Sequence, residues 1–584
     1  MPDDPYRSEL ADGMRIEWNV PIPVDDDTVL RADIFRPDDT GTHPVLMTYG
    51  PYGKGLHFAE GFPAQWDKLA ADHPDVTEGS TNKYQAWEVV DPERWVPYGY
   101  VCIRVDSRGS GWTPGYLDPF SPRETQDYYE AIEWAAAQPW SNGRIGLNGV
   151  SYYAMNQWQV AAKRPPHLAA ICPFEGAVDF YRDATHHGGI VSEFWATWYP
   201  FQVMNVQYGL GEKGRVNPNT GQSIAGAETL DEDTRAANRA DIRADIQAHS
   251  LDDDFYAQRR PDLSAIEVPV LSAANWGGQG LHSRGNFTGF TDAGSARKWL
   301  EVHGLEHWTE FYTDYGRDLQ KRFFDHFLLG ADNGWDVQPP VQLRIRDTGG
   351  GFTTRAEQEW PLARTDWTTY YLDFTDGTLT TQPPTDASVV EFDALGDGVT
   401  LLAKPFAEDT EITGPSATSL SLRSSTTDAD LFVVLRLFDP DGQEVLFTAA
   451  VEPRAPLSQG WLRASHRKLD PARSRPYQPW HTHDELQPLT PGEACRADVE
   501  IWPTCVVAPA GYRLGLTVLG RDYDNSLGAP HPMIYRRAMT GSGCWWHTDP
   551  TDRPADVFGG RTTLETSPDH PATLLVPIIP RSHP

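Results

Sequence analysis

The stretch Ile145-Gly-Leu-Asn-Gly-Val-Ser-Tyr-Tyr-Ala-Met155 predicts a strand, a sharp turn and a helix in close succession. Its first residues suit a buried strand end, and Gly149 permits the close backbone approach that the turn needs. This order is typical of the Gly-x-Ser-x-Gly nucleophile elbow, in which a strained turn holds a serine hydroxyl at the edge of a sheet. Ser151 is therefore a candidate nucleophile, although Tyr153 stands where the motif has its second glycine. Taken alone, the stretch fits an ordinary strand-turn-helix equally well.

The segments around the elbow alternate between apolar strands and helices. Residues 44–48 and 100–106 are short apolar runs, and each continues into a loop rich in glycine. Residues 125–137 carry apolar side chains at helical spacing, and residues 168–174 form another apolar run after the elbow. This alternation predicts an α/β fold with a parallel sheet, whose ligands bind beyond the carboxyl ends of the strands. The elbow and both loops are expected at that edge.

The rest of the chain divides into three regions. Residues 181–261 interrupt the α/β rhythm, and we expect them to form a helical cap inserted over the sheet edge. The α/β core that begins in residues 1–180 resumes in residues 262–334. Residues 335–584 contain short alternating segments separated by turns, a pattern typical of an all-β jelly roll or sandwich.

Composition argues against several classes of partner. The chain of 584 residues has a formal net charge of -33 and no run rich in lysine or arginine, so we expect no nucleic-acid binding. No apolar run approaches the length of a membrane span, and the N-terminus lacks the pattern of a secretion signal. Five cysteines without Cys-x-x-Cys spacing indicate neither a disulfide framework nor a zinc site. We therefore expect a cytoplasmic protein without membrane contact, either a monomer or a homo-oligomer.

A serine nucleophile needs a base, which we expect in the loop after a late core strand. His307 lies just past the apolar run that ends at Val302, and it is the first candidate. His303 is the rival, but a histidine at a strand end commonly has a structural role. Weaker candidates, which also lack the His-x-x-x-His spacing of a metal site, are His186, His187 and His282. No metal is predicted.

Six motifs in a fixed order resemble the cocaine-esterase and X-prolyl dipeptidyl-peptidase family of α/β-hydrolases over nearly the whole chain. They are Pro51-Tyr-Gly-Lys54, Asp106-Ser-Arg-Gly-Ser-Gly111, Gly149-Val-Ser-Tyr152, Asp179-Phe-Tyr-Arg-Asp183, the His307 loop, and Gly460-Trp-Leu-Arg-Ala-Ser-His-Arg467 with Ala510-Gly-Tyr-Arg-Leu514. The resemblance implies an α/β-hydrolase domain, a helical cap and a C-terminal jelly roll of the galactose-binding type. These are the same three regions that composition and periodicity predict.

The resemblance also implies roles for individual residues. Ser151 is the nucleophile, His307 is the general base, and the oxyanion hole consists of the Tyr152 backbone N–H and the Tyr52 phenol. Donors aimed at a developing oxyanion in a dry cleft usually make the largest single contribution to catalysis. Without the resemblance, Tyr52 is better interpreted as a loop tyrosine that packs its ring.

The acid of the triad is where this sequence departs from the family. The family's aspartate follows the strand near residues 268–274, but the loop here reads Asn275-Trp-Gly-Gly-Gln279, with Gly278 at the acid's position. Either Ser151 and His307 form a dyad, or the acid comes from another strand. In the second case Glu175, at the exit of the neighbouring strand, is the best substitute, and its alternative role is to bond a backbone amide or an arginine. Further candidates for the acid are Asp179, Glu306 and Glu310. We also hypothesise that Tyr153 fills space beside the glycines of this loop.

The predicted function is that of a serine hydrolase that cleaves a small ester or amide through an acyl-enzyme, without an organic cofactor. Esterase or acylase activity is the first interpretation, and X-prolyl dipeptidyl-peptidase activity on a peptide substrate is the alternative. A hypothesis of another class is a catalytically degenerate protein whose jelly roll binds carbohydrate or another partner. It is motivated by the absent family acid and the absent second glycine of the elbow.

Overall fold

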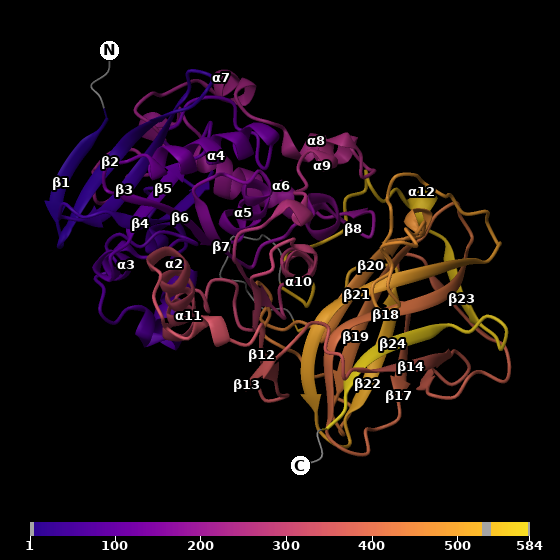
Figure 1. Cartoon of the computed structure of the whole chain (residues 1–584). Coiled ribbons are helices and arrows are strands. Elements are labelled where there is room, and N and C mark those ends of the chain that lie inside the picture. The colour runs from indigo at the N-terminus through magenta and orange to yellow at the C-terminus, as the bar shows by residue number, and fades with distance from the viewer. Residues whose placement is uncertain (1–4, 528–538, 582–584) are drawn as a thin grey trace.

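The computed structural model describes residues 5–527 and 539–581, and its N-terminal part is built on one large mixed sheet (Figure 1). The central strands from β4 to β11 pair in parallel, whereas β1, β2, β3 and β13 form antiparallel edges. Among the described residues this sheet has eleven strands, which in spatial order are β1 (Arg7–Ala11), β2 (Met14–Pro23), β3 (Val29–Pro37), β5 (Val101–Asp106), β4 (His43–Gly50), β6 (Ser141–Val150), β7 (Leu168–Phe174), β10 (Val270–Asn275), β11 (Lys298–His303), β12 (Val341–Arg346) and β13 (Phe352–Glu357).

Helices that follow the central strands cover the sheet. They include α4 (Pro122–Ala136), α5 (Tyr152–Ala162), α10 (Ser283–Asp292) and α11 (Asp314–Phe324). The apolar stripe that the sequence predicts on α4 is buried, and the Ser121 side chain caps this helix by accepting a hydrogen bond from the Glu124 N–H. In residues 5–527 and 539–581, every helix is too short or too polar to cross a bilayer. The predicted α/β fold is confirmed.

The insertion, residues 181–261, contains short helical turns. These are α6 (Phe194–Trp198), α7 (Glu232–Ala237), α8 (Ile242–Ala248) and α9 (Asp254–Ala257), preceded by a π-helical turn at Phe180–Thr185. Phe194, Trp195 and Trp198 are buried in the same apolar cluster as Tyr52 and Tyr152, so the insertion packs directly on the elbow. Its aromatic residues are therefore shared between its own core and that of the sheet edge.

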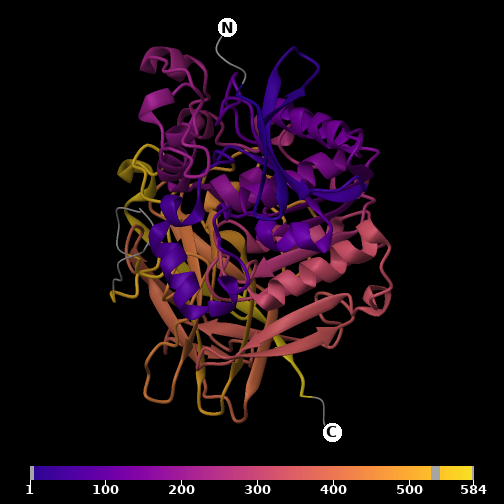
Figure 2. The same cartoon turned by 90° about the vertical axis from the view of Figure 1, so that its left-hand side faces the viewer.

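The C-terminal part is all-β, and in Figure 2 its orange and yellow strands lie mostly below the indigo strands of the first sheet. Its buried apolar side chains form a core of their own. The described strands are, in spatial order, β16 (Ser388–Asp393), β23 (Arg561–Thr566), β18 (Thr410–Ser424), β24 (Thr573–Ile579), β14 (Asp366–Asp373), β15 (Thr378–Thr380), β17 (Val399–Ala403), β22 (Arg513–Leu519), β19 (Asp430–Phe438) and β20 (Ser458–Arg463), with β21 (Cys495–Ala508) paired to β18.

Strand β12 lies in a different sheet from the one that the sequence indicates. The sequence pattern places residues 341–345 in the C-terminal all-β region, but β12 extends the first sheet by pairing in parallel with β11. A domain boundary after residue 334 therefore separates β12 and β13 from the sheet to which they belong. Alternating apolar residues are expected for a half-buried strand of either sheet, so periodicity cannot assign β12 to one of them.

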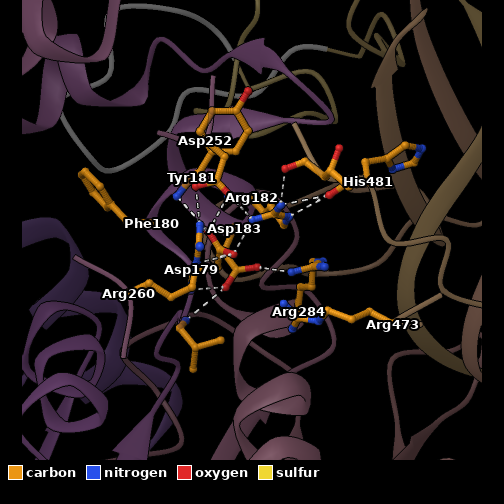
Figure 3. A network of polar contacts seen from close by, with 12 residues as sticks. Asp179, Phe180, Tyr181, Arg182, Asp183, Asp252, Arg260, Arg284, Arg473 and His481 are labelled. Atoms are coloured by element: carbon orange, nitrogen blue, oxygen red, sulfur yellow. Dashed lines mark hydrogen bonds and ion pairs between the residues drawn. The ribbon is translucent and has the colours of Figure 1, made fainter. Parts of the chain in front are cut away.

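A buried network of charged side chains joins the α/β core, the insertion and the C-terminal part (Figure 3). The guanidinium of Arg182 donates to Asp179 at 2.8 Å, to Asp252 at 2.6 Å and to the carbonyl of His481 at 2.9 Å. Arg260 also donates to Asp179, at 3.0 Å. Burial alone would raise the pKa of Asp179, but the two arginines hold it below its usual range. The motif at residues 179–183 thus connects regions far apart in the sequence.

Arg284 extends this network from α10 to β21. Its guanidinium donates to Asp183 at 2.7 Å and to Glu500 at 3.0 Å, and its side chain is almost fully buried. The ring of Trp480 lies 5.0 Å from the guanidinium carbon, on the side of the C-terminal part. Burial raises the pKa of Asp183, so this carboxylate depends on Arg284 for its charge balance.

We predict that Arg284→Met destabilises the fold strongly, because it leaves Asp183 buried without its cation. Loss of one partner of a buried pair costs about 3–5 kcal/mol, so the midpoint of urea unfolding should fall. The control is Arg496→Met, whose exposed guanidinium pairs with Asp498 on the same strand. That variant should change the free energy of unfolding by less than about 0.5 kcal/mol. Equal midpoints for the two variants would contradict the prediction.

Candidate active site

Ser151 lies in a strained turn between β6 and α5. Its φ is 60° and its ψ is -114°, a conformation that is rare for a residue with a side chain. The Ser151 N–H donates to the Phe174 carbonyl at 3.1 Å, which fixes the turn on the neighbouring strand. Gly149 has φ 157°, and a Cβ there would lie 2.5 Å from the Cβ of Tyr153. The chain therefore forms an elbow that presents Ser151 to a pocket.

Tyr153 packs on a different side of the elbow from the one that we hypothesised. Its ring lies against Gly50 at the end of β4, where a Cβ would come within 2.8 Å of the ring, and it meets the Tyr52 ring edge-on at 5.5 Å. Gly277 instead faces the backbone of Ala449 in the C-terminal part. The proposed coupling of Tyr153 to the glycines after β10 is therefore wrong, and Gly50 provides the space for the tyrosine.

Glu175 lies between two histidines directly after β7. Its Oε2 accepts a hydrogen bond from Nδ1 of His307 at 2.9 Å, and its Oε1 accepts one from Nε2 of His303 at 3.1 Å. Asn275, in the loop that lacks the family's aspartate, donates to the same Oε1 at 3.1 Å. Nδ1 of His303 in turn contacts Glu301 at 2.7 Å. Glu175 is buried and has φ 48°, so a strained backbone holds the carboxylate in place.

The other three carboxylates that are candidates for the triad acid pair with lysine or arginine instead of His307. Glu306 pairs with Lys68 at 3.1 Å, and Glu310 pairs with Arg344 at 2.8 Å. Asp179 belongs to the charged network of Figure 3. In the described part of the chain, none of these three bonds the imidazole of His307.

The remaining candidate histidines have other contacts. Nε2 of His303 bonds Oε1 of Glu175, and His282 stacks on His307 with ring centres 5.0 Å apart. Nδ1 of His187 contacts Nε2 of His547 at 2.8 Å, and His186 stacks on Tyr181. His282 is the one of these four that lines the pocket with Ser151.

The two predicted oxyanion donors flank Ser151. The phenol of Tyr52 accepts a hydrogen bond from Nε1 of Trp198 at 3.0 Å, which leaves its own O–H to donate. Burial raises the pKa of Tyr52 well above its ordinary value, whereas the neighbouring Ser151 hydroxyl lowers it. The N–H of Tyr152 belongs to the first turn of α5, where N–H groups have no intrahelical acceptor.

Glu88 is a residue of the site that the sequence reasoning missed. Its Oε1 lies 2.8 Å from Nε2 of His307, the nitrogen that a serine nucleophile would use, and it lines the pocket beside Ser151. No hydrogen bond joins the described side chains of Ser151 and His307. The segment around Glu88 has no strand or helix pattern, so the one signal in the sequence is an acidic residue among aromatic ones, Trp87-Glu88.

The two carboxylates set the protonation of the imidazole between them. Burial alone would lower the pKa of His307, but Glu175 and Glu88 raise it to about 10. Burial raises the pKa of Glu88 to about 6, although the bond with His307 lowers it. Burial alone would raise the pKa of Glu175, but His307 and His303 hold it below its usual range. Both carboxylates therefore favour the protonated form of His307.

All three regions of the chain contribute to the pocket. Trp195 and Trp198 come from the insertion, whereas Ala450 and Trp545 come from the C-terminal part. The Ala450 carbonyl accepts a hydrogen bond from the His307 N–H at 2.9 Å, so the C-terminal part also fixes the histidine loop.

A strained serine at an elbow and a histidine bonded to a carboxylate share one pocket, which is the arrangement of a serine hydrolase. Residues 26–309 match the family model of the X-Pro dipeptidyl-peptidase (S15 family), and residues 333–572 match that of the X-Pro dipeptidyl-peptidase C-terminal non-catalytic domain. A CocE/NonD family hydrolase of Staphylococcus aureus is 32% identical with a TM-score of 0.83, over 97% of this chain and 94% of that one. The chain belongs to this family of X-Pro dipeptidyl-peptidases and CocE/NonD hydrolases.

Two more distant similarities extend the comparison. The cocaine esterase of a Rhodococcus strain is 23% identical over 656 residues, which cover 98% of this chain and 100% of the esterase. An aminopeptidase from a marine-sediment Thaumarchaeota archaeon has a TM-score of 0.67 at 16% identity, over 99% of this chain and 97% of that one, and it shows the fold alone. The family resemblance found from the six motifs is confirmed.

Proposed function

We propose that the protein hydrolyses small esters or amides through an acyl-enzyme on Ser151. The observation that supports this most is the 2.9 Å contact between His307 and Glu175, because the same imidazole lines the pocket with Ser151. A carboxylate on Nδ1 fixes the tautomer whose Nε2 exchanges protons with a nucleophile. In this proposal Glu175 acts in place of the family's aspartate, which Gly278 does not supply.

In the proposed reaction, Oγ of Ser151 attacks the acyl carbonyl while Nε2 of His307 takes the hydroxyl proton. The Tyr52 phenol and the Tyr152 N–H stabilise the charge that develops on the carbonyl oxygen. The imidazolium then gives its proton to the leaving alcohol or amine as the bond to the acyl carbon breaks. Water repeats the sequence on the acyl-enzyme: its oxygen bonds the acyl carbon, its proton passes through His307, and Ser151 leaves as the free hydroxyl.

We further propose that the insertion is a cap and that the C-terminal part is a jelly roll that closes one side of the pocket. The supporting contacts are those of Trp198 with Tyr52 and of Ala450 with His307. The cavity has a volume of about 30 Å³ between aromatic side chains. This narrow, apolar space favours a small acyl group, and esterase or acylase activity is the first proposal. X-prolyl dipeptidyl-peptidase activity is the second, because the matching family model carries that description.

The first test is labelling of Ser151 with a fluorophosphonate, which we expect to be stoichiometric in the wild type and absent in Ser151→Ala. The same variant should lose roughly 10⁴-fold or more of kcat on a p-nitrophenyl acyl ester. The comparison substrate is Gly-Pro-p-nitroanilide, and a higher kcat/KM on this anilide than on the esters would favour the peptidase. Absent labelling of the wild type would contradict both activities and favour a degenerate binding protein.

The second test is Glu175→Gln, which keeps the volume of the side chain but removes the charge that orients His307. We expect kcat on an activated ester to fall roughly 10²- to 10⁴-fold with little change in KM, because the imidazole loses its tautomeric control. Glu306→Gln is the matched control, since Glu306 precedes His307 in the loop after β11 and bonds Lys68. Glu175 is not the orienting acid if both variants stay within a few-fold of the wild type.

A further inference from the structure

A second cavity, larger than the one at Ser151, lies between α10 and the C-terminal part. Its volume is about 270 Å³, compared with about 30 Å³ for the pocket at the nucleophile. Its walls come from α10, from the segment Trp360-Pro361 after β13, from residues 472–480 and from β18 and β21. The two cavities share no lining residue in the described part of the chain. The second cavity is therefore separate from the site of the proposed reaction.

Three arginines line this cavity, and one of them is buried. They are Arg284, Arg473 and Arg475. Arg284 reaches the cavity from α10, where its Nε donates to Glu500 at 3.0 Å and its Nη1 donates to Asp183 at 2.7 Å. Among the described residues, its Nη2 has no hydrogen-bond partner. A buried guanidinium with an unused donor at a cavity indicates a place for an acceptor.

The charge of Arg473 is poorly compensated. Within the described chain its guanidinium makes no hydrogen bond, and its one ion pair is with the half-exposed Asp292 at 3.8 Å. The guanidinium carbon lies 3.5 Å from the centre of the Trp480 ring. Burial and the nearby cations of Arg182 and Arg284 lower the pKa of Arg473, although Asp292 acts in the opposite direction. An anion bound in the cavity would stabilise this cation.

Arg475 is also without a carboxylate partner. Its Nη1 donates to the backbone carbonyls of residues 472, 473 and 474 at 3.0 to 3.3 Å, and it forms no ion pair with a described residue. Glu500 lines the same cavity, but its two oxygens accept hydrogen bonds from Arg284 and Gln478. Of the described carboxylates in the lining, Asp292 alone remains for the two arginines of this loop.

Much of the remaining lining is apolar. The rings of Trp360 and Phe287 stack with centres 4.6 Å apart and planes inclined by 20°. The cavity is also lined by Pro361, Pro415 and Pro503. A guanidinium presents a planar fork that matches the two oxygens of a carboxylate. A ligand that suits both parts of the lining therefore carries a carboxylate on a flat apolar body.

We propose that this cavity is a binding site for a small organic carboxylate, whose anionic group pairs with Arg473 and Arg475 and whose flat body packs on Trp360. Arg284, which lies beside Arg473 in Figure 3, adds a third cation from α10. The proposal does not depend on the proposed hydrolase function, because the cavity has its own lining. Helix α10 begins directly after His282, which lines the Ser151 pocket, so the ligand contacts the helix that follows the active-site loop.

The test measures binding of benzoate by isothermal titration calorimetry, with benzamide as a neutral ligand of similar shape. We expect benzoate to bind the wild type saturably, with a Kd of about 1 mM or lower. Benzamide should bind at least about tenfold more weakly, because it carries no charge for a guanidinium. Equal affinities for the two ligands, or no saturable binding of benzoate, would overturn the proposal.

Acetate tests the apolar part of the site. It has the carboxylate of benzoate but lacks the ring, so it should bind at least about tenfold more weakly. The difference reflects the apolar area that the ring buries on the wall with Trp360 and Phe287. An affinity for acetate equal to that for benzoate would contradict the proposed packing.

Substitution of the arginines shows where benzoate binds. Arg473→Gln and Arg475→Gln should each weaken binding about tenfold or more, whereas Arg473→Lys keeps the charge and should lose only about threefold. The control is Arg496→Gln, which removes an exposed arginine paired with Asp498 and should leave the affinity unchanged. These variants do not alter the Ser151 pocket. Unchanged benzoate binding in both glutamine variants of the loop therefore overturns the proposal.

Thermal unfolding gives a second readout. Benzoate should raise the unfolding midpoint of the wild type, because a ligand that binds only the folded state stabilises it. The rise should be smaller in Arg473→Gln, and an equal rise in both proteins would count against the site. The side chain of Arg473 is 46% exposed, so we expect this variant to fold. Its midpoint without benzoate, compared with that of the wild type, checks this expectation.

Discussion

The buried carboxylate of Glu175 is the interaction on which the geometry of the site depends. It binds His307 through one oxygen and His303 and Asn275 through the other, so three elements of the sheet edge converge on it. A buried charge of this kind is costly unless it is paired and hydrogen-bonded, and here both conditions are met. The donors are the last residues of β10 and β11 and a histidine in the loop after β11. A shift of either strand end or of the loop would leave part of the charge unsatisfied. The electrostatic requirement of one side chain therefore fixes the relative positions of the loops that form the pocket.

The C-terminal part is also required for this geometry. The carbonyl of Ala450 accepts the N–H of His307, and the backbone of Ala449 packs where Gly277 has no side chain. The charged network around Arg182 and Arg284 joins the same parts through residues of the insertion (Figure 3). Packing and ion pairing thus hold a largely all-β region against the loop that carries the histidine. Its contribution to the site is one of position, since the charged groups of the pocket come from the α/β part.

The sequence predicts those features of the fold and site that depend on local pattern. The elbow around Ser151, the helix of residues 122–136 and the parallel strands follow from periodicity and glycine placement. The histidine after β11 and the carboxylate after β7 follow from the rule that ligands bind at the strand ends. Features that depend on long-range packing are not predicted. The alternating pattern of β12 would fit either sheet, and the ring of Tyr153 packs against Gly50. Glu88 is missed for the same reason, because a loop residue with left-handed backbone reaches the site through tertiary contacts.

The position of Glu88 also explains why the arrangement does not resemble a resting triad. One carboxylate on Nδ1 prepares an imidazole to accept a proton on Nε2, but a second carboxylate on Nε2 stabilises the protonated form. The two contacts have nearly equal lengths, 2.9 and 2.8 Å, so neither alone defines the state of His307. What distinguishes the carboxylates is their surroundings: Glu175 has further donors from His303 and Asn275, whereas Glu88 has an oxygen without a partner in the described chain. Glu175 is therefore the more firmly held of the two carboxylates, and its contact orients the imidazole.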